Sequence, residues 1–135
     1  MSETIIDDGN IAQNLRKIWP NGADKVLELI GTTTLDDSLL GLKEGGIACM
    51  SGIMGNKWTL DDWNPMEHVP TGSYLTSYTG GVPEFLETPL SELAKRFLEG
   101  SLPLQIGKVF KLVKIVEAHA LMEANGAKGK IVVLT

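Results

Sequence analysis

Residues 22–52 have the sequence GADKVLELIGTTTLDDSLLGLKEGGIACMSG, and this stretch decides the predicted fold. Two mainly apolar runs within it, Val26–Ile30 and Ile47–Met50, each end within two residues of a glycine and predict buried strands. In the segment between these two runs, Thr34 and Asp37 form a weaker version of the capping box, which predicts the start of a helix. Leucines at helical spacing continue that helix, and a glycine pair ends it: Leu35, Leu39 and Leu42, then Gly45-Gly46.

The segments on the N-terminal side extend the same alternation. Apolar residues one helical turn apart predict a helix between Asn10 as its cap and Pro20 as its stop: Ile11, Leu15 and Ile18. The short apolar run Thr4–Asp7 predicts a strand before that helix. Strands and helices that alternate through short connections are typical of right-handed crossovers and a parallel sheet. Because the strands are almost continuously apolar, we expect helices on both faces of the sheet.

The rest of the chain begins with a segment that lacks regular periodicity and then alternates between predicted strands and helices. Residues 53–72 lack periodicity and predict a loop, whose length favours a functional role. Tyr74–Thr79 alternates between apolar and polar residues and predicts an edge strand. The later patterns predict a helix beginning near Thr88-Pro89, a strand at Lys108–Leu112, a helix carrying Ile115, Ala118 and Met122, and a strand at Ile131–Leu134.

Composition and charge exclude several classes of protein. The 135 residues are 43% hydrophobic and 21% charged, which is typical of a domain with its own core. The net charge of −5 argues against a nucleic-acid binder. Residues 100–135 nevertheless carry five lysines and two glutamates, a charge of +3. This basic segment is either a solvated surface or a contact for a phosphate.

Membrane and secretion signals are missing from the sequence. Its longest apolar runs are far shorter than the ~20 residues that a membrane helix needs, so no membrane association is expected. The first ten residues lack the basic and apolar regions of a signal peptide, and Cys49 is the single cysteine, which excludes a disulfide framework. These features predict a cytoplasmic location.

Several runs of residues together carry a resemblance to a known superfamily. They are residues 22–31, residues 42–47 with Ser51-Gly52, Asn64-Pro65-Met66, Tyr78–Gly81 and Gly129–Leu134. In this order they resemble the C-terminal portion of medium-chain dehydrogenases/reductases, in the branch of quinone oxidoreductases and zinc-type alcohol dehydrogenases. The implied fold is α/β: the second half of a Rossmann-type doubly wound parallel sheet in residues 1–81, and a strand–helix–strand segment in residues 82–135.

The resemblance also implies a partial cofactor site. The residues that match cofactor-contacting positions are Gly31, Thr32, Ser51, Gly52, Ile53, Ser77, Tyr78, Thr79 and Lys130. The first two correspond to a ribose contact, the next six to the nicotinamide and its carboxamide, and Lys130 to the phosphates. The Rossmann fingerprint G-x-G-x-x-G is absent, so binding of NAD or NADP by this chain alone is expected to be weak or absent. From spacing alone, a turn-making role of Gly31 and Gly52 is favoured over a role in letting a ligand approach the backbone.

The remaining reactive side chains predict neither a catalytic residue nor a metal site. His119 is expected to be a half-buried structural residue, and His68 to be exposed on the loop. Cys49 is expected to be an unreactive core thiol, because a reactive one needs an exposed, electropositive setting. One cysteine with two distant histidines does not supply a zinc site. The loop residues Trp58 and Trp63 either stack on a ligand ring or anchor the loop, with anchoring favoured.

Two functions from different classes follow. The first is a fragment of an NAD(P)-dependent oxidoreductase, which contributes the nicotinamide side of the cofactor site and is inactive alone. The second is a non-catalytic module that self-associates, with homo-oligomer formation through the Tyr74–Thr79 edge strand, because unpaired edges are templates for pairing.

Overall fold

The computed structural model describes residues 3–135 and divides the chain into two compact units. The first unit extends to Val82 and the second comprises Pro83–Thr135. The two units are described separately below. Within the described residues no helix is long and apolar enough to cross a membrane.

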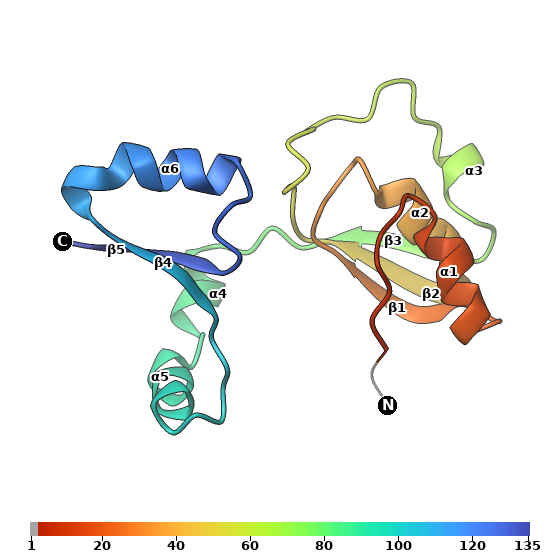
Figure 1. Ribbon diagram of the computed structural model, residues 1–135. Helices are drawn as coiled ribbons and strands as arrows, with labels where there is room; N and C mark the ends of the chain where they lie inside the picture. Colours follow the sequence, from red (N-terminus) through yellow and green to blue (C-terminus); the bar gives the residue numbers. More distant parts are fainter. Residues whose placement is uncertain (1–2) are drawn as a thin grey trace. The chain divides into compact units, whose positions relative to one another are not determined.

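The first unit is built on a three-stranded parallel sheet (Figure 1). Its strands are β1 (Ala23–Glu28), β2 (Leu42–Met50) and β3 (Tyr74–Ser77), in the order β1-β2-β3. Leu27 pairs with Cys49, and Met50 pairs with Ser77. The predicted α/β class and parallel sheet are therefore confirmed, and β3 lies at an edge as expected.

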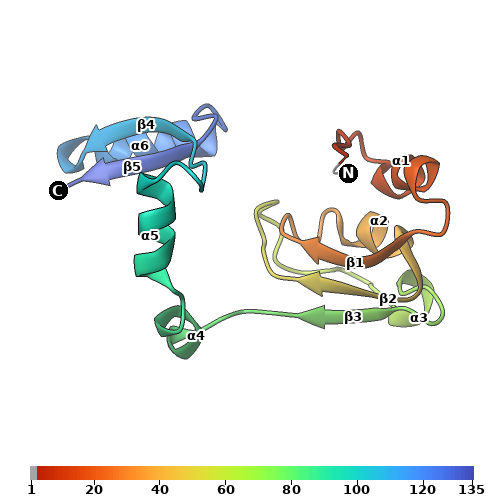
Figure 2. The same ribbon diagram turned by 90° about the horizontal axis from the view of Figure 1, so that it is seen from below.

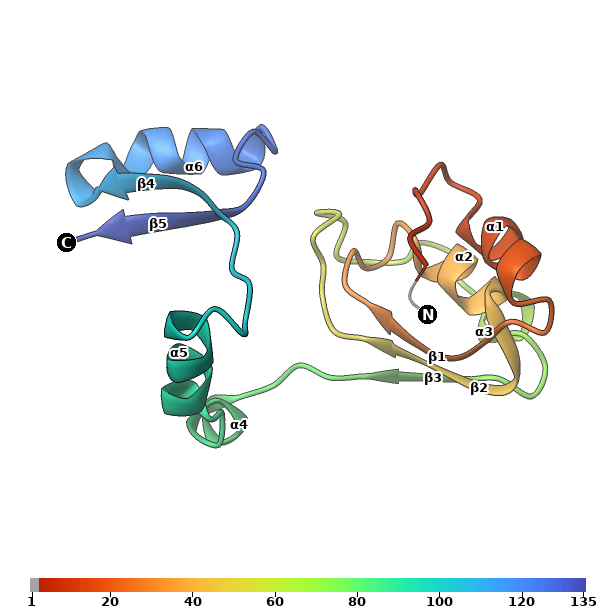
Figure 3. The same ribbon diagram turned by 60° about the horizontal axis from the view of Figure 1, so that its bottom comes forward.

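Helices cover only one face of this sheet (Figures 2 and 3). They are α1 (Ile11–Ile18) and α2 (Leu35–Leu40). The loop between β2 and β3 contains a third, short helix, α3 (Pro65–His68). The core on that face consists of Leu35, Leu39, Leu42 and Ala48. The expectation of helices on both faces is wrong for this unit.

The opposite face of the sheet is exposed. The pairing places Leu27, Ile47 and Tyr74 on it, and these side chains are 64%, 39% and 61% exposed. An apolar run shows that a strand tolerates burial on both sides. It does not supply the second layer that would bury it.

Asp37 and Thr34 act differently from the predicted capping box. The Thr34 side chain makes no cap hydrogen bond to α2. The Asp37 carboxylate instead accepts hydrogen bonds from the main-chain N–H of Ile11, at 2.6 Å, and of Ala12. It therefore caps α1, whose own N-cap residue Asn10 provides no side-chain bond.

The glycine pair Gly45-Gly46 lies inside β2 rather than ending α2. Ala23 pairs with Leu42 and Lys25 pairs with Ile47, so the pairing skips several residues of β2. Gly45 has a φ of +76°, and a Cβ at Gly46 would lie 2.8 Å from the carbonyl oxygen of Lys43. The pair therefore makes an irregularity in the strand that other residues would strain. The N-terminal run Thr4–Asp7 is another correction, because it forms no strand.

The second unit contains the predicted strand–helix–strand segment. Strands β4 (Ile106–Lys111) and β5 (Lys130–Leu134) are parallel, and α6 (Ile115–Glu123) lies along them after the 3-10 turn η1 (Leu112–Lys114) (Figure 3). Before them come α4 (Val82–Leu86), which the sequence pattern missed, and α5 (Leu90–Leu98).

Candidate functional site

The carboxyl ends of β2 and β3 form a pocket of about 510 Å³. Two of the predicted segments line it together, Ser51–Ile53 after β2 and Ser77–Thr79 after β3. The N–H of Tyr78 donates to the carbonyl of Met50 at 3.0 Å and fixes the two chain ends side by side. Met50, Met54 and Trp58 complete the lining. In open α/β sheets ligands bind at this edge.

The glycines at this edge allow two protein turns to touch. Gly31 has a φ of +103°, and a Cβ there would lie 2.9 Å from the carbonyl oxygen of Gly52. A Cβ at Gly52 would overlap the carbonyl of Leu29. Both glycines therefore serve the packing of the turn after β1 against the turn after β2, as the turn-making interpretation expected.

Glu28 organises the first of these turns and was missed by the sequence interpretation. Its side chain is only 4% exposed. The carboxylate accepts hydrogen bonds from the N–H of Ile30 at 2.7 Å and of Gly31 at 3.0 Å, and from the hydroxyls of Thr34 and Ser38. A lone acidic residue in an apolar strand, followed by hydroxyl residues, is the signal that predicts such a network.

The hydrogen bonds determine the ionisation of Glu28. Burial by itself raises the pKa of this carboxyl, but the bonds from Ser38, Gly31, Ile30 and Thr34 outweigh it and lower the pKa below the ordinary glutamate value. Glu28 is thus a buried carboxylate that joins the end of β1 to the start of α2.

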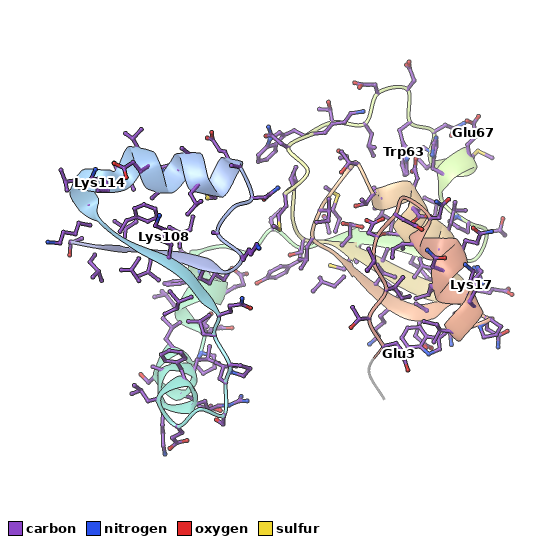
Figure 4. All side chains as sticks on the ribbon, in the orientation of Figure 1. Glu3, Lys17, Trp63, Glu67, Lys108 and Lys114 are labelled. Atoms are coloured by element: carbon purple, nitrogen blue, oxygen red, sulfur yellow. The ribbon has the colours of Figure 1, made fainter. Side chains whose placement is uncertain are left out.

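The loop between β2 and β3 is attached to α2 by a cluster of three side chains. The indole N–H of Trp63 donates to Asp36 at 2.9 Å, and His68 Nδ1 lies 3.0 Å from the same carboxylate. The Trp63 and His68 rings stack with centroids 5.3 Å apart. Figure 4 labels Trp63 on this loop. The expectation of an exposed His68 is wrong, because Trp63 and Asp36 hold it half-buried.

The two loop tryptophans therefore differ. Trp63 anchors the loop, as the favoured interpretation predicts, whereas Trp58 is 73% exposed and lines the pocket. His119 is exposed on α6 rather than half-buried. Within residues 3–135, no group of three or more metal-ligating side chains lies close enough to hold an ion.

Lys130 lies apart from the pocket residues in the chain, at the start of β5 in the second unit. Its main-chain N–H donates to the carbonyl of Gln105 at 2.8 Å. The structure thus brings together six of the nine predicted site residues around one pocket, places Gly31 against Gly52, and leaves Lys130 in the other unit.

A larger groove of about 600 Å³ lies elsewhere, around the turn between α1 and β1. Trp19, Asp24 and Lys43 are among its lining residues. Asp24 and Lys43 form an ion pair 2.5 Å apart that lowers the pKa of Asp24, and both side chains are exposed. The groove lies at the amino ends of the strands, away from the edge where α/β sheets bind ligands.

Comparison with known families and structures identifies the fold of this chain. A family model described as zinc-binding dehydrogenase matches residues 2–133. The chain belongs to the zinc-binding dehydrogenase family. The resemblance noted from the sequence is therefore confirmed, as is the match to the C-terminal portion of medium-chain dehydrogenases/reductases. No match was found among curated protein sequences.

Solved structures agree with this assignment. A mycobacterial protein in complex with NADPH matches 99% of this chain with a TM-score of 0.72 and 20% identity. A quinone oxidoreductase from Pseudomonas syringae matches 93% with a TM-score of 0.74 and 17% identity. An NAD-dependent alcohol dehydrogenase matches 93% with a TM-score of 0.67 and 22% identity. At these identities the likeness shows the fold. The chain spans 42%, 40% and 35% of the lengths of these three proteins.

Proposed function

We propose that this chain contributes the nicotinamide side of the cofactor site in an NAD(P)-dependent oxidoreductase that reduces a quinone, enone or aldehyde. The observation that carries the proposal is the pocket between Ser51–Ile53 and Ser77–Thr79 at the carboxyl edge of the sheet. Its volume of about 510 Å³ lies within the range of small-molecule sites. Membership of the family supports the same assignment.

The lining of the pocket fits a flat ring with one amide group. Met50, Met54 and Trp58 provide apolar surface. Within the described residues, the main-chain N–H groups of Gly52 and Thr79 have no hydrogen-bond acceptor, so they are available to a carboxamide oxygen. A bound nicotinamide would supply the hydride chemistry, while these residues hold and orient the ring and exclude water from it. Gly31-Thr32 is proposed to contact the ribose.

Titration of the isotope-labelled chain by NMR tests this assignment. Nicotinamide mononucleotide should shift the amide resonances of Gly52, Ile53 and Thr79, with a dissociation constant of about 1 mM, or roughly −4 kcal/mol. Adenosine monophosphate is the matched control. It carries the same ribose phosphate but lacks the nicotinamide ring and its carboxamide, so it should leave these resonances unchanged. Equal shifts with both nucleotides, or none with either, would contradict the proposal.

Turnover is tested separately. The chain spans 35–42% of the three solved proteins, so we expect no hydride transfer by the chain alone. The measurement is the absorbance of NADPH with a panel of quinones, against a heat-treated control. Oxidation well above that control would show that the chain contains a complete site.

A second candidate function is supported by the exposed edge of β3. All four residues of this strand are exposed, and one of its edges is unpaired in the described unit. A non-catalytic role as a self-association module would pair this edge with its copy in a second chain, as two-fold symmetric dimers do. Light scattering over a dilution series distinguishes this role, since a monomer at high concentration would exclude it.

A further inference from the structure

The loop that follows the pocket is held on both sides of Trp58. On the N-terminal side, the Thr32 hydroxyl donates to the carbonyl of Lys57 at 2.5 Å, and the N–H of Gly55 donates to the carbonyl of Ile30 at 2.7 Å. Lys57 is the residue directly before Trp58. This half of the loop is therefore fixed to the turn after β1.

The C-terminal side of the loop is fixed to α2. Trp63 and His68 both reach the Asp36 carboxylate, at 2.9 Å and 3.0 Å, and their rings stack. Leu60, two residues after Trp58, packs against the hydrophobic core. The backbone on both sides of Trp58 is thus anchored, while its own side chain is 73% exposed.

The Trp58 indole is exposed although the backbone on both sides of it is anchored. Burial of the ring would gain free energy, since aromatic side chains bury large apolar areas. Trp58 instead lines the same pocket as Gly52 and Tyr78, and Met54 from the same loop lines it too. Its apolar face is available to a flat ligand there.

We propose that Trp58 forms an aromatic wall of this pocket and stacks on the planar ring of the bound ligand. Thr32 is then a positioning residue, which acts through the Lys57 carbonyl to hold Trp58 in place. This role of the Thr32 hydroxyl is additional to the ribose contact proposed for the Gly31-Thr32 turn. The inference rests on the proposed nicotinamide site, and it adds both a ligand contact and a residue that positions it.

The three tryptophans of the chain allow a direct test by NMR. Nicotinamide mononucleotide should shift the indole N–H resonance of Trp58. The indole N–H of Trp63 is hydrogen-bonded to Asp36, and Trp19 lies at the end of α1, in the groove at the turn between α1 and β1. The indole resonances of these two residues should therefore stay unchanged. The amides of Gly52 and Thr79 report independently on occupancy of the pocket.

Substitutions separate stacking from positioning. Trp58→Ala should weaken binding about threefold to tenfold, which is the size expected for loss of one aromatic stack. Trp58→Phe should retain most of the affinity, and Trp19→Ala is the control at an exposed tryptophan outside the pocket. Thr32→Val should weaken binding and broaden the Trp58 indole resonance, whereas Thr32→Ser keeps the hydroxyl and should restore both.

The outcomes distinguish this inference from the proposed function. Shifts at Gly52 and Thr79 without one at Trp58, or equal affinity in Trp58→Ala, would overturn the stacking role and leave the nicotinamide site intact. The absence of any shift in the pocket would overturn both. Equal Trp58 signals in Thr32→Val and the unaltered chain would overturn the positioning role of Thr32 alone.

Discussion

The two compact units of the chain differ most in what they bury. In the first unit, Leu35 and Leu39 are 1% and 0% exposed, and a buried carboxylate, Glu28, ties the sheet to α2. In the second unit, Phe110 and Ala118 are the buried hydrophobic residues among those described. Many of its other apolar side chains face solvent, among them Phe85, Leu98, Val113 and Val116.

This difference shows that amphipathic pattern and burial are separate properties. Helix α5 has Leu90, Leu93 and Phe97 at helical spacing on one side, yet it has no buried residue. Large exposed apolar surfaces in soluble proteins usually mark interaction sites. We therefore expect the first unit to carry most of the stability of the chain, and the second to depend on further contacts.

The largest expected effect is loss of the buried Leu39 side chain. Leu39→Ala should destabilise the first unit by about 2–5 kcal/mol, because it removes buried methyl groups and leaves a cavity. Leu98→Ala is the matched change in the second unit, where the side chain is 83% exposed, and should cost less than about 0.5 kcal/mol. Urea denaturation measures both, and similar losses would contradict the comparison.

Replacement of the buried carboxylate should have the next largest effect. Glu28→Gln keeps the shape but removes the charge that four donors stabilise, and should cost about 1.5–3 kcal/mol. Hydrogen exchange at Ile30 and Gly31 should become faster. Glu99→Gln, on an exposed helix end in the second unit, is the control and should leave stability nearly unchanged.

The lowered pKa of Glu28 gives a pH dependence of known sign. A carboxyl whose pKa is lower in the folded than in the unfolded state binds fewer protons when folded, so its contribution is complete above the unfolded pKa. That contribution is lost as the pH falls through the lower, folded pKa. The stability of the first unit should therefore decrease below about pH 4.3, the ordinary glutamate value, and Glu28→Gln should reduce this slope. An unchanged slope in the variant would assign the effect to other carboxyls.

Self-association through β3 provides a smaller and more specific test. Because N–H groups alternate sides along a strand and that of Tyr78 donates to Met50 in β2, the N–H of Thr76 also points to β2 and that of Leu75 to the open edge. Leu75→Pro should weaken a dimer about tenfold while β3 stays paired to β2. Thr76→Pro should instead disrupt β3 itself.

Two controls complete this test. Leu75→Ala removes the side chain but keeps the N–H, so it should preserve the dimer. Light scattering measures the association and circular dichroism the fold. A dimer unaffected by Leu75→Pro would exclude this edge as the interface and favour the exposed apolar surface of the second unit.

The smallest effect is expected at the exposed ion pair of α5. Lys95 and Glu99 lie 3.8 Å apart with 73% and 55% of their side chains exposed. Lys95→Ala should change stability by less than about 0.5 kcal/mol, and that change should vanish in high salt. A larger effect would show that α5 is packed in solution against a surface that this unit does not contain.

Much of the fold follows from local patterns in the sequence. The helix Ile11–Ile18 has the predicted ends, because spacing and stop signals act within a few residues. The two strands predicted before glycines and the edge strand are also found, since their apolar runs are short and bounded by turns, although β1 ends at Glu28 rather than at Ile30. The predicted and observed boundaries differ at Gly45-Gly46, because this glycine pair lies inside β2 instead of ending α2.

The sequence by itself determined the α/β class, the order of most elements and the two segments that line the pocket. Tertiary structure alone decided which partner each polar group found: Asp37 caps a helix 26 residues away rather than its own, and Glu28 joins two elements. It also decided that Trp63 anchors the loop while Trp58 remains exposed. The physical reason is that periodicity encodes which side of a segment is apolar, whereas hydrogen-bond partners and burial depend on segments brought together only by folding.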